Sequence, residues 1–158
     1  MAIDISKNNN HIVMFPTFVA SAMGQYGHII NLVMQADTDN GTLATKGDYV
    51  SFEQYKAGAV TANSVEVTIR EAAAERGCWY VEFTKLPADQ IYIVYNSPVS
   101  PYPQTELKDE ALFYNEKGDV TQGMEVHLGD CYSLSEDAFT GTITAGAVAK
   151  YSAGKFVI

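Results

Sequence analysis

Short alternating segments dominate the chain from about residue 40 onward, and they constrain its fold more than any other feature. In the segment SVEVTIRE, Val65, Val67 and Ile69 fall on one face and polar side chains on the other, which is the two-residue period of a β-strand. The segments CWYVEFTKL and QIYIVYN are rich in aromatic and β-branched residues, and each ends in polar or proline-containing sequence. The pattern predicts a mainly β protein.

We expect one β-rich domain with a short N-terminal extension. A chain of 158 residues is long enough to bury a core within a single domain. We predict an antiparallel β-sandwich or barrel-like domain over residues 26–158, with at most one or two short helical turns. Residues 1–25 are predicted to form an N-terminal arm or an irregular first strand.

The segment REAAAERG, residues 70–77, has the clearest helical character. Its alanines favour a helix, and Gly77 would end it. Because the segment is short and joins two convincing strands, we expect a helical turn or an extended loop at the end of a hairpin. The C-terminal segment GTITAGAVAKYSAGKFVI is predicted to hold three short strands separated by Ala-Gly turns.

Two similar phrases occur in the chain, KGDYVSF at residues 46–52 and LGDCYSL at residues 128–134. Glycine adopts the positive φ angles of tight turns and aspartate hydrogen-bonds its own backbone there, so each phrase predicts a turn that leads into a strand. Asn40-Gly41 predicts a further turn of the kind found in hairpins. The tetrapeptide AGAV also occurs twice. Chance recurrence of common turn residues is the alternative explanation.

The chain is acidic, with 19 Asp and Glu residues against 10 Lys and Arg residues and a net charge of −9. This charge disfavours binding to nucleic acid, because phosphates would be repelled. No continuous apolar stretch is long enough to predict a membrane span, and the first residues lack the layout of a secretory signal. We therefore expect folding in the cytoplasm of the producing cell, with Cys78 and Cys131 reduced and packed. A disulfide between them is the less favoured alternative.

None of the common motifs for nucleotide binding, nucleophilic catalysis or zinc binding occurs in the sequence. His127 is expected to be an exposed strand residue on the same face as Glu125. The segment ADTDNGT resembles the start of a calcium loop, but Gly41 comes one position too early. The acidic pairs at 109–110 and 136–137 are expected in solvated loops. We predict no catalytic residue, no metal site, no cofactor and no enzymatic activity.

The N-terminal segment differs from the rest, because its apolar residues follow neither a strand period nor a helical period. It reads either as an irregular first strand that covers the core or as an arm that packs on a partner. The residues assigned to such a partner contact are His11, Ile12, Val13, Met14, Phe15, Phe18 and Met23. The proline-rich segment SPVSPYPQTE is predicted to be an ordered connection or a contact loop. Its candidate contact residues are Pro98, Pro101, Tyr102 and Pro103.

Three phrases together resemble the head decoration, or cement, proteins of tailed bacteriophages. They are LGDCYSLS, the ending FTGTITAGAVAKYSAGKFVI and the earlier NGTLATKGDYV, and the resemblance covers roughly residues 38–158. It implies a non-enzymatic virion protein that binds the exterior of an assembled capsid and stabilises it. The implied partner is the major capsid protein, and the implied oligomer is a trimer at local threefold positions.

Members of this family commonly anchor through an N-terminal arm, which would give the segment NNNHIVMFPTFVASAMG, residues 8–24, that role. On this interpretation, deleting residues 1–22 should leave the β domain folded and abolish its association with capsids. A second hypothesis is a surface-displayed adhesin or a carbohydrate-binding β-sandwich module, in which exposed aromatic side chains stack on sugars. The aromatic residues considered for that role are Trp79, Tyr92, Tyr102 and Tyr114.

Overall fold

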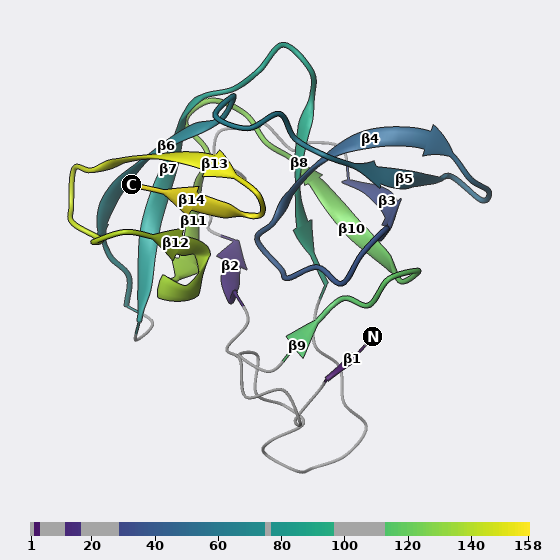
Figure 1. Ribbon diagram of the computed structural model, residues 1–158, viewed down its shortest axis with the longest axis horizontal. Coiled ribbons are helices and arrows are strands. Elements are labelled where there is room, and N and C mark those ends of the chain that lie inside the picture. The colour runs from purple at the N-terminus through teal and green to yellow at the C-terminus, as the bar shows by residue number, and fades with distance from the viewer. Residues whose placement is uncertain (1, 4–11, 17–28, 75–76, 97–112) are drawn as a thin grey trace.

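The computed structural model describes residues 2–3, 12–16, 29–74, 77–96 and 113–158 (Figure 1). Almost all of its regular structure is β-strand, and the one helical element in these residues is the 3₁₀ turn η3, Glu136–Ala138. The predicted mainly β fold is therefore confirmed.

The strands are short, as the spacing of the turn signals predicted. In chain order they are β1 Ala2–Ile3, β2 Met14–Pro16, β3 Ile29–Val33, β4 Leu43–Tyr49, β5 Gln54–Gly58, β6 Glu66–Ala72, β7 Cys78–Lys85, β8 Ile91–Tyr95, β9 Phe113–Tyr114, β10 Val120–Glu125, β11 Cys131–Ser135, β12 Phe139–Thr140, β13 Val148–Ser152 and β14 Lys155–Val157.

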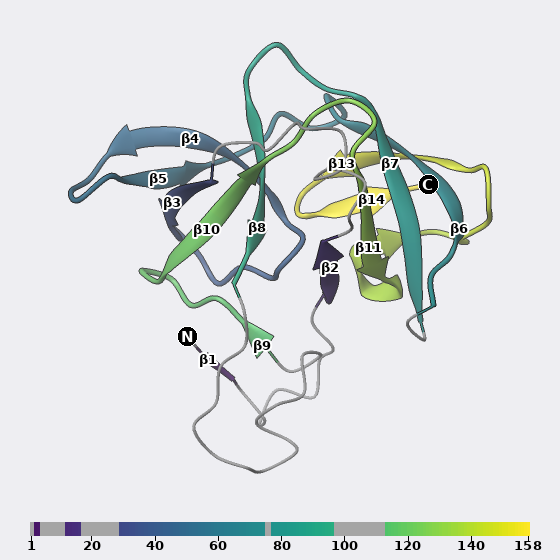
Figure 2. The ribbon, with the colours of Figure 1, turned by 180° about the vertical axis from the view of Figure 1, so that it is seen from behind.

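The strands form a closed barrel packed beside a larger open sheet. The barrel has the order β10-β3-β5-β4-β8, and the seven-stranded sheet has the order β12-β14-β13-β6-β7-β11-β2. A separate pair joins β1 to β9. The barrel and the sheet stand side by side in both ribbon views (Figures 1 and 2). The pairings are antiparallel as predicted, except that β3 runs parallel to β5 and β12 parallel to β14.

Strand β8 forms the wall between the barrel and the sheet. Ile91 and Ile93 belong to the large core cluster that the barrel shares with the sheet. Tyr92 and Val94 point the other way, into a smaller cluster around Leu32. A strand buried on both faces reads as a continuous apolar run rather than as an alternation, which explains the sequence QIYIVYN.

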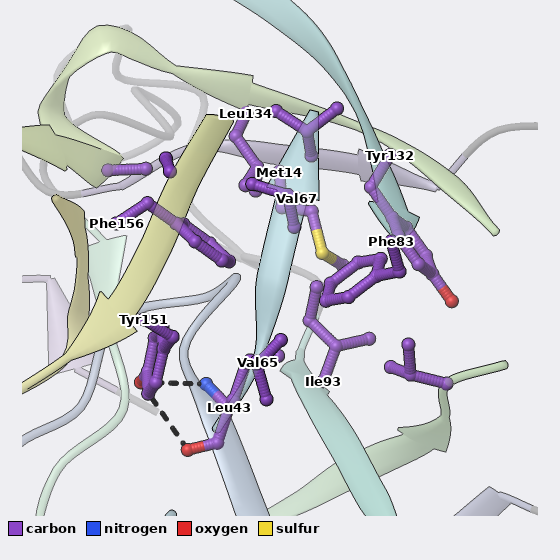
Figure 3. Packing of buried hydrophobic residues seen from close by; sticks show 14 of the residues in the cluster. Met14, Leu43, Val65, Val67, Phe83, Ile93, Tyr132, Leu134, Tyr151 and Phe156 are labelled. Atoms are coloured by element: carbon purple, nitrogen blue, oxygen red, sulfur yellow. Dashed lines mark hydrogen bonds between the residues drawn. The ribbon is translucent and has the colours of Figure 1, made fainter. Parts of the chain in front are cut away.

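The large core cluster is held together by a row of aromatic rings (Figure 3). Phe83 lies 5.8 Å from Tyr132 and 6.3 Å from Phe156, centroid to centroid, and Phe156 lies 5.2 Å from Tyr151. These three contacts are edge-to-face, the arrangement that ring quadrupoles favour. At the end of the row, Tyr151 reaches across from the sheet to the barrel. Its hydroxyl accepts a hydrogen bond from Leu43 N at 2.9 Å and donates one to Leu43 O at 3.4 Å.

Strand β2 is part of this core rather than a free arm. Ile12 is 4% exposed and Met14 is 3% exposed, and β2 is itself an edge strand of the seven-stranded sheet, paired with β11. Of the two interpretations of the N-terminal segment, the first strand that covers the core is the correct one for residues 12–16. Deleting residues 1–22 would remove two buried side chains, so in place of the intact β domain expected from the sequence we expect this deletion to destabilise the domain.

The two Gly-Asp phrases have different structures. Gly129 has a φ of 89° in a turn that leads into β11, as predicted. Gly47 and Asp48 instead lie inside β4, where the register with β5 shifts and forms a bulge. A Cβ on Gly47 would lie 2.6 Å from Lys56 O, so glycine is needed there for close approach of the strands and not for a turn. The prediction of a turn at this site is wrong.

Other turn predictions are correct in part. Gly41 has a φ of 84° in a turn, but this turn joins β3 to β4, which are not paired, so it makes no hairpin. The tetrapeptide AGAV begins in strand β5 at its first occurrence and forms the turn before β13 at its second. The two occurrences therefore do not share one structure.

Two segments can be compared in detail with the sequence-based expectation. In REAAAERG, strand β6 continues to Ala72 and Ala73 N donates to Cys78 O, so the described part is an extended hairpin end, one of the two expected alternatives, and not a helical turn. At the C-terminus, β13 and β14 are joined by a turn at Ala153-Gly154, as predicted. The residues GTIT, 141–144, form no strand; the short strand β12 lies just before them and ends at Thr140.

Candidate docking site at the hairpin between β4 and β5

The hairpin between β4 and β5 ends in a tight turn of an unusual sequence. Gln54 N donates to Ser51 O at 2.9 Å, and Val50 N donates to Gln54 O at 2.8 Å. The two residues inside the turn, Phe52 and Glu53, both have positive φ, at 49° and 59°. This is the backbone of a type I′ turn, which matches the twist of the flanking strands and strongly favours Asn-Gly.

The residues in this turn are poorly suited to their backbone conformation. An L-residue in the left-handed region brings its Cβ close to the following carbonyl oxygen, at a cost of roughly 1–2 kcal/mol per residue. Phe52 recovers none of this cost by packing, because its side chain is 87% exposed. Strain of this kind is concentrated in binding and catalytic sites, so the turn is a candidate functional site.

The turn carries an apolar surface to the far end of the barrel. Tyr49 is 61% exposed, Val50 is 44% exposed and Phe52 is 87% exposed; we call these three residues the hairpin tip. Ile29 is also exposed, at 60%. It lies two residues before Asn31, which pairs with Gln54 beside the turn. The hairpin extends away from the seven-stranded sheet in both ribbon views (Figures 1 and 2). Exposed apolar clusters of this kind are typical of interaction sites.

The strands below the tip hold it in a fixed orientation. Tyr49 and Tyr55 pack edge-to-face across the hairpin, with ring centroids 5.6 Å apart. The Lys46 ammonium lies 4.0 Å from the centroid of the Tyr55 ring, a cation–π contact. Strand β5 is paired on its other side with β3. A pre-ordered tip loses little conformational entropy when it binds, which favours affinity.

The residues predicted from sequence to contact a partner are not brought together into one described site. Ile12 and Met14 are buried in the core, and Val13 is half-buried, with its backbone N donating to Ser135 Oγ at 3.0 Å. Phe15 lies in β2 opposite Ser133. The remaining candidates lie outside the described residues: His11, Phe18, Met23, Pro98, Pro101, Tyr102 and Pro103.

The aromatic residues considered for sugar stacking do not form an exposed platform. Tyr92 is 7% exposed and Tyr114 is 6% exposed, so both are core residues, and Trp79 is half-buried. Tyr102 lies outside the described residues. The expectation that Tyr92 and Tyr114 are exposed is wrong, because β8 is buried on both faces and β9 is buried at both of its residues.

The position and the exposure of His127, at the end of β10, also differ from the expectation. His127 follows the strand and is half-buried, not an exposed strand residue. Its Nε2 lies 3.3 Å from Glu125 Oε1 and its Nδ1 lies 3.8 Å from Asp130 Oδ2. The Asp130 carboxylate is fully buried and accepts a hydrogen bond from His127 N at 2.8 Å. Burial raises the pKa of Asp130, and the His127 N–H and imidazole oppose that rise.

In the segment that resembles the start of a calcium loop, the carboxylates accept hydrogen bonds from backbone N–H groups. Asp37 Oδ1 accepts from Lys117 N at 3.0 Å, and Asp39 Oδ2 accepts from Ile12 N at 3.2 Å. Within the described ranges, no group of three or more His, Cys, Asp and Glu side chains is placed to hold a metal ion.

The two cysteines are not joined by a disulfide. They lie at opposite ends of the β7·β11 pairing, with Cys78 opposite Ser135 and Cys131 opposite Glu82. Cys78 is buried and Cys131 is half-buried, and burial raises the pKa of the Cys131 thiol. The prediction of two reduced, packed cysteines agrees with this arrangement.

The fold and the hairpin tip together define a small barrel-and-sheet protein with an apolar projection. No protein-family model, no curated protein and no solved structure shows a significant match to the chain. In the part of the chain that the structure describes, no helix has the length and apolar character needed to cross a membrane.

Proposed function

We propose that this protein is a non-enzymatic structural component of a tailed-phage virion, which binds the exterior of the assembled capsid and stabilises it. Its partner in this proposal is the major capsid protein, and the hairpin tip makes the principal contact. The protein is made in the host cytoplasm and acts as a homo-oligomer, with a trimer favoured. The oligomer and the capsid follow from the resemblance of its turn and strand phrases to decoration proteins.

One observation carries the proposal: an exposed aromatic side chain stands on a strained turn at the end of a rigid hairpin. If the turn served only to reverse the chain, Asn-Gly would suit its backbone better than Phe52-Glu53. Replacing the exposed Phe52 would then cost little stability. Aromatic anchors that fill a pocket on a partner dominate the binding energy of many protein interfaces. The tip has the exposure and the rigidity that such an anchor needs.

The acidic charge and the size of the protein are compatible with this role. Each tip offers a small contact, so a single copy would bind weakly. Copies linked in an oligomer bind with an increased effective concentration, and many weak contacts then hold together. A protein that binds only the assembled shell stabilises it by mass action.

The test is co-sedimentation with capsids that lack this protein. Phe52→Ala should reduce the bound fraction at limiting concentration, with an apparent affinity at least about tenfold lower, because truncation of a central aromatic anchor costs about 2 kcal/mol or more. The matched control is Val148→Ala, which removes a 51% exposed side chain from the seven-stranded sheet. The control should bind as the wild type does.

A second variant separates loss of contact from loss of fold. The double substitution Phe52→Asn and Glu53→Gly places the preferred sequence in the type I′ turn, so the hairpin should remain folded while its aromatic anchor is lost. We expect this variant to bind capsids as poorly as Phe52→Ala. Undiminished binding by both variants would show that the hairpin tip is not the anchor.

A further inference from the structure

An open pocket lies where the barrel meets the sheet, apart from the hairpin tip. Its volume is about 440 Å³, within the range of small-molecule sites. It is formed by the third and fourth residues of β4, the loop between β5 and β6, the loop between β7 and β8, and the first residues of β8. The residues that line it are Thr45, Lys46, Ala59, Thr61, Ser64, Pro87, Asp89, Gln90, Ile91 and Tyr92.

The polar groups of this pocket are mainly hydrogen-bond acceptors. Ser64 Oγ donates its hydrogen to Thr61 O at 2.7 Å. This hydroxyl can therefore accept a hydrogen bond from a ligand through its lone pairs. Gln90 Nε2 donates to Ile91 O at 2.9 Å and to Val126 O at 3.2 Å, which fixes the amide, and its Oε1 can only accept. Asp89 adds a carboxylate to the same lining. Such a set matches a ligand that has several O–H donors.

The charges of the lining argue for a neutral ligand. It holds one carboxylate, Asp89, and one ammonium group, Lys46, so their charges cancel. A phosphate or a divalent cation would need an excess of one sign. The Lys46 ammonium also packs over the Tyr55 ring, which orients it. Ala59, which is exposed, and Pro87, which is half-buried, supply apolar surface against which the carbon skeleton of a ligand can pack.

The pocket is held open by the backbone on either side. Asn63, with a φ of 62°, forms a turn in which Ser64 N donates to Thr61 O at 3.2 Å. Asn63 N donates to Tyr151 O at 2.8 Å, which ties this turn to the seven-stranded sheet. On the barrel side, glycine at position 58 gives the Thr45 hydroxyl its space, because a Cβ there would collide with it. The lining is therefore in place before any ligand binds.

We propose that this pocket binds a neutral, hydroxyl-rich ligand, one or two sugar residues of a glycan. The Asp89 carboxylate, Gln90 Oε1 and the lone pairs of the Thr61 and Ser64 hydroxyls accept hydrogen bonds from the sugar hydroxyls. Lys46 donates to a ring or hydroxyl oxygen, and Pro87 packs against the sugar ring. This activity does not depend on the hairpin tip or on capsid binding, and it would let a surface-exposed copy adhere to glycans.

The experiment is a titration of the isotopically labelled protein with a panel of neutral monosaccharides and disaccharides, followed by two-dimensional amide NMR. At least one sugar should shift the amides of residues 59–64 and 87–92 with a millimolar or lower Kd. Asp89→Ala should weaken binding of that sugar about tenfold or more, because a hydrogen bond to a charged group is lost. Asp89 is exposed, so this substitution leaves the core intact.

Two controls make the outcome decisive. Phe52→Ala, at the hairpin tip, should bind the sugar with an unchanged Kd, which separates this site from the capsid-binding proposal. Ser64→Ala, in the loop between β5 and β6, should weaken binding in the same direction as Asp89→Ala. The proposal is overturned if no sugar of the panel perturbs these amides, or if Asp89→Ala and Ser64→Ala both bind as the wild type does.

Discussion

At the scale of single residues, the Tyr151 hydroxyl couples the barrel to the sheet and should make folding sensitive to alkaline pH. Burial raises the pKa of Tyr151 from 10.0 to about 12, while its hydrogen bond to Leu43 lowers it. A tyrosine with a raised pKa in the folded state contributes stability that is fully present below pH 10. This contribution is lost as pH rises towards about 12, and two pKa units correspond to about 3 kcal/mol.

Tyr151→Phe should have two effects, measured by urea unfolding across the pH range. At pH 7 it should lower the free energy of unfolding by about 1–3 kcal/mol, because Leu43 N is left without its buried acceptor. Between pH 10 and 12 the variant should lose less stability than the wild type. Tyr132→Phe is the comparison, since it keeps Tyr151 and hence this part of the alkaline transition. Equal pH profiles for wild type and Tyr151→Phe would contradict the assignment.

At the scale of elements, the turn at the hairpin tip should be a site where stability and binding oppose each other. Replacing Phe52 and Glu53 with Asn and Gly relieves two residues of left-handed strain, partly offset by the greater entropy of glycine in the unfolded chain. We expect the free energy of unfolding of the variant to be about 1 kcal/mol higher than that of the wild type. Thermal and urea unfolding would measure this, and a less stable variant would remove the argument from strain.

The same turn shows why sequence alone did not reveal the candidate site. The period of two along β6 and the continuous apolar run along β8 predict strands, because burial of one face or of both faces selects those residues. Turn prediction depends on Gly, Asn and Asp, and the chain reverses at Phe52-Glu53 while Gly47-Asp48, the better turn sequence, forms a bulge. The exposed apolar run in YVSFEQY was the available signal. The pocket gave none, because its lining comes from separate loops that only the fold brings together.

At the scale of the whole molecule, the N-terminal strand closes the core and is supported by a distant turn. Gly41, in the turn before β4, lies directly against Ile12, Met14 and Leu134: a Cβ there would come within 2.9 Å of Leu134 Cδ2 and 3.2 Å of Ile12 Cγ2. Asp39 in the same loop accepts a hydrogen bond from Ile12 N. Residues 12–16 therefore connect the turn before the barrel strand β4 to the sheet strand β11.

Two nested truncations should separate a core strand from a dispensable arm. Deleting residues 1–16 removes Ile12 and Met14, and loss of two buried aliphatic side chains at about 2–5 kcal/mol each should leave the domain marginally stable or unfolded. Deleting residues 1–11 keeps both side chains and the β2·β11 pairing, so this protein should retain a cooperative transition in urea. If the longer truncation unfolds at the same urea concentration as the shorter one, β2 contributes nothing to the core, and residues 12–16 return to the candidate partner-binding surface.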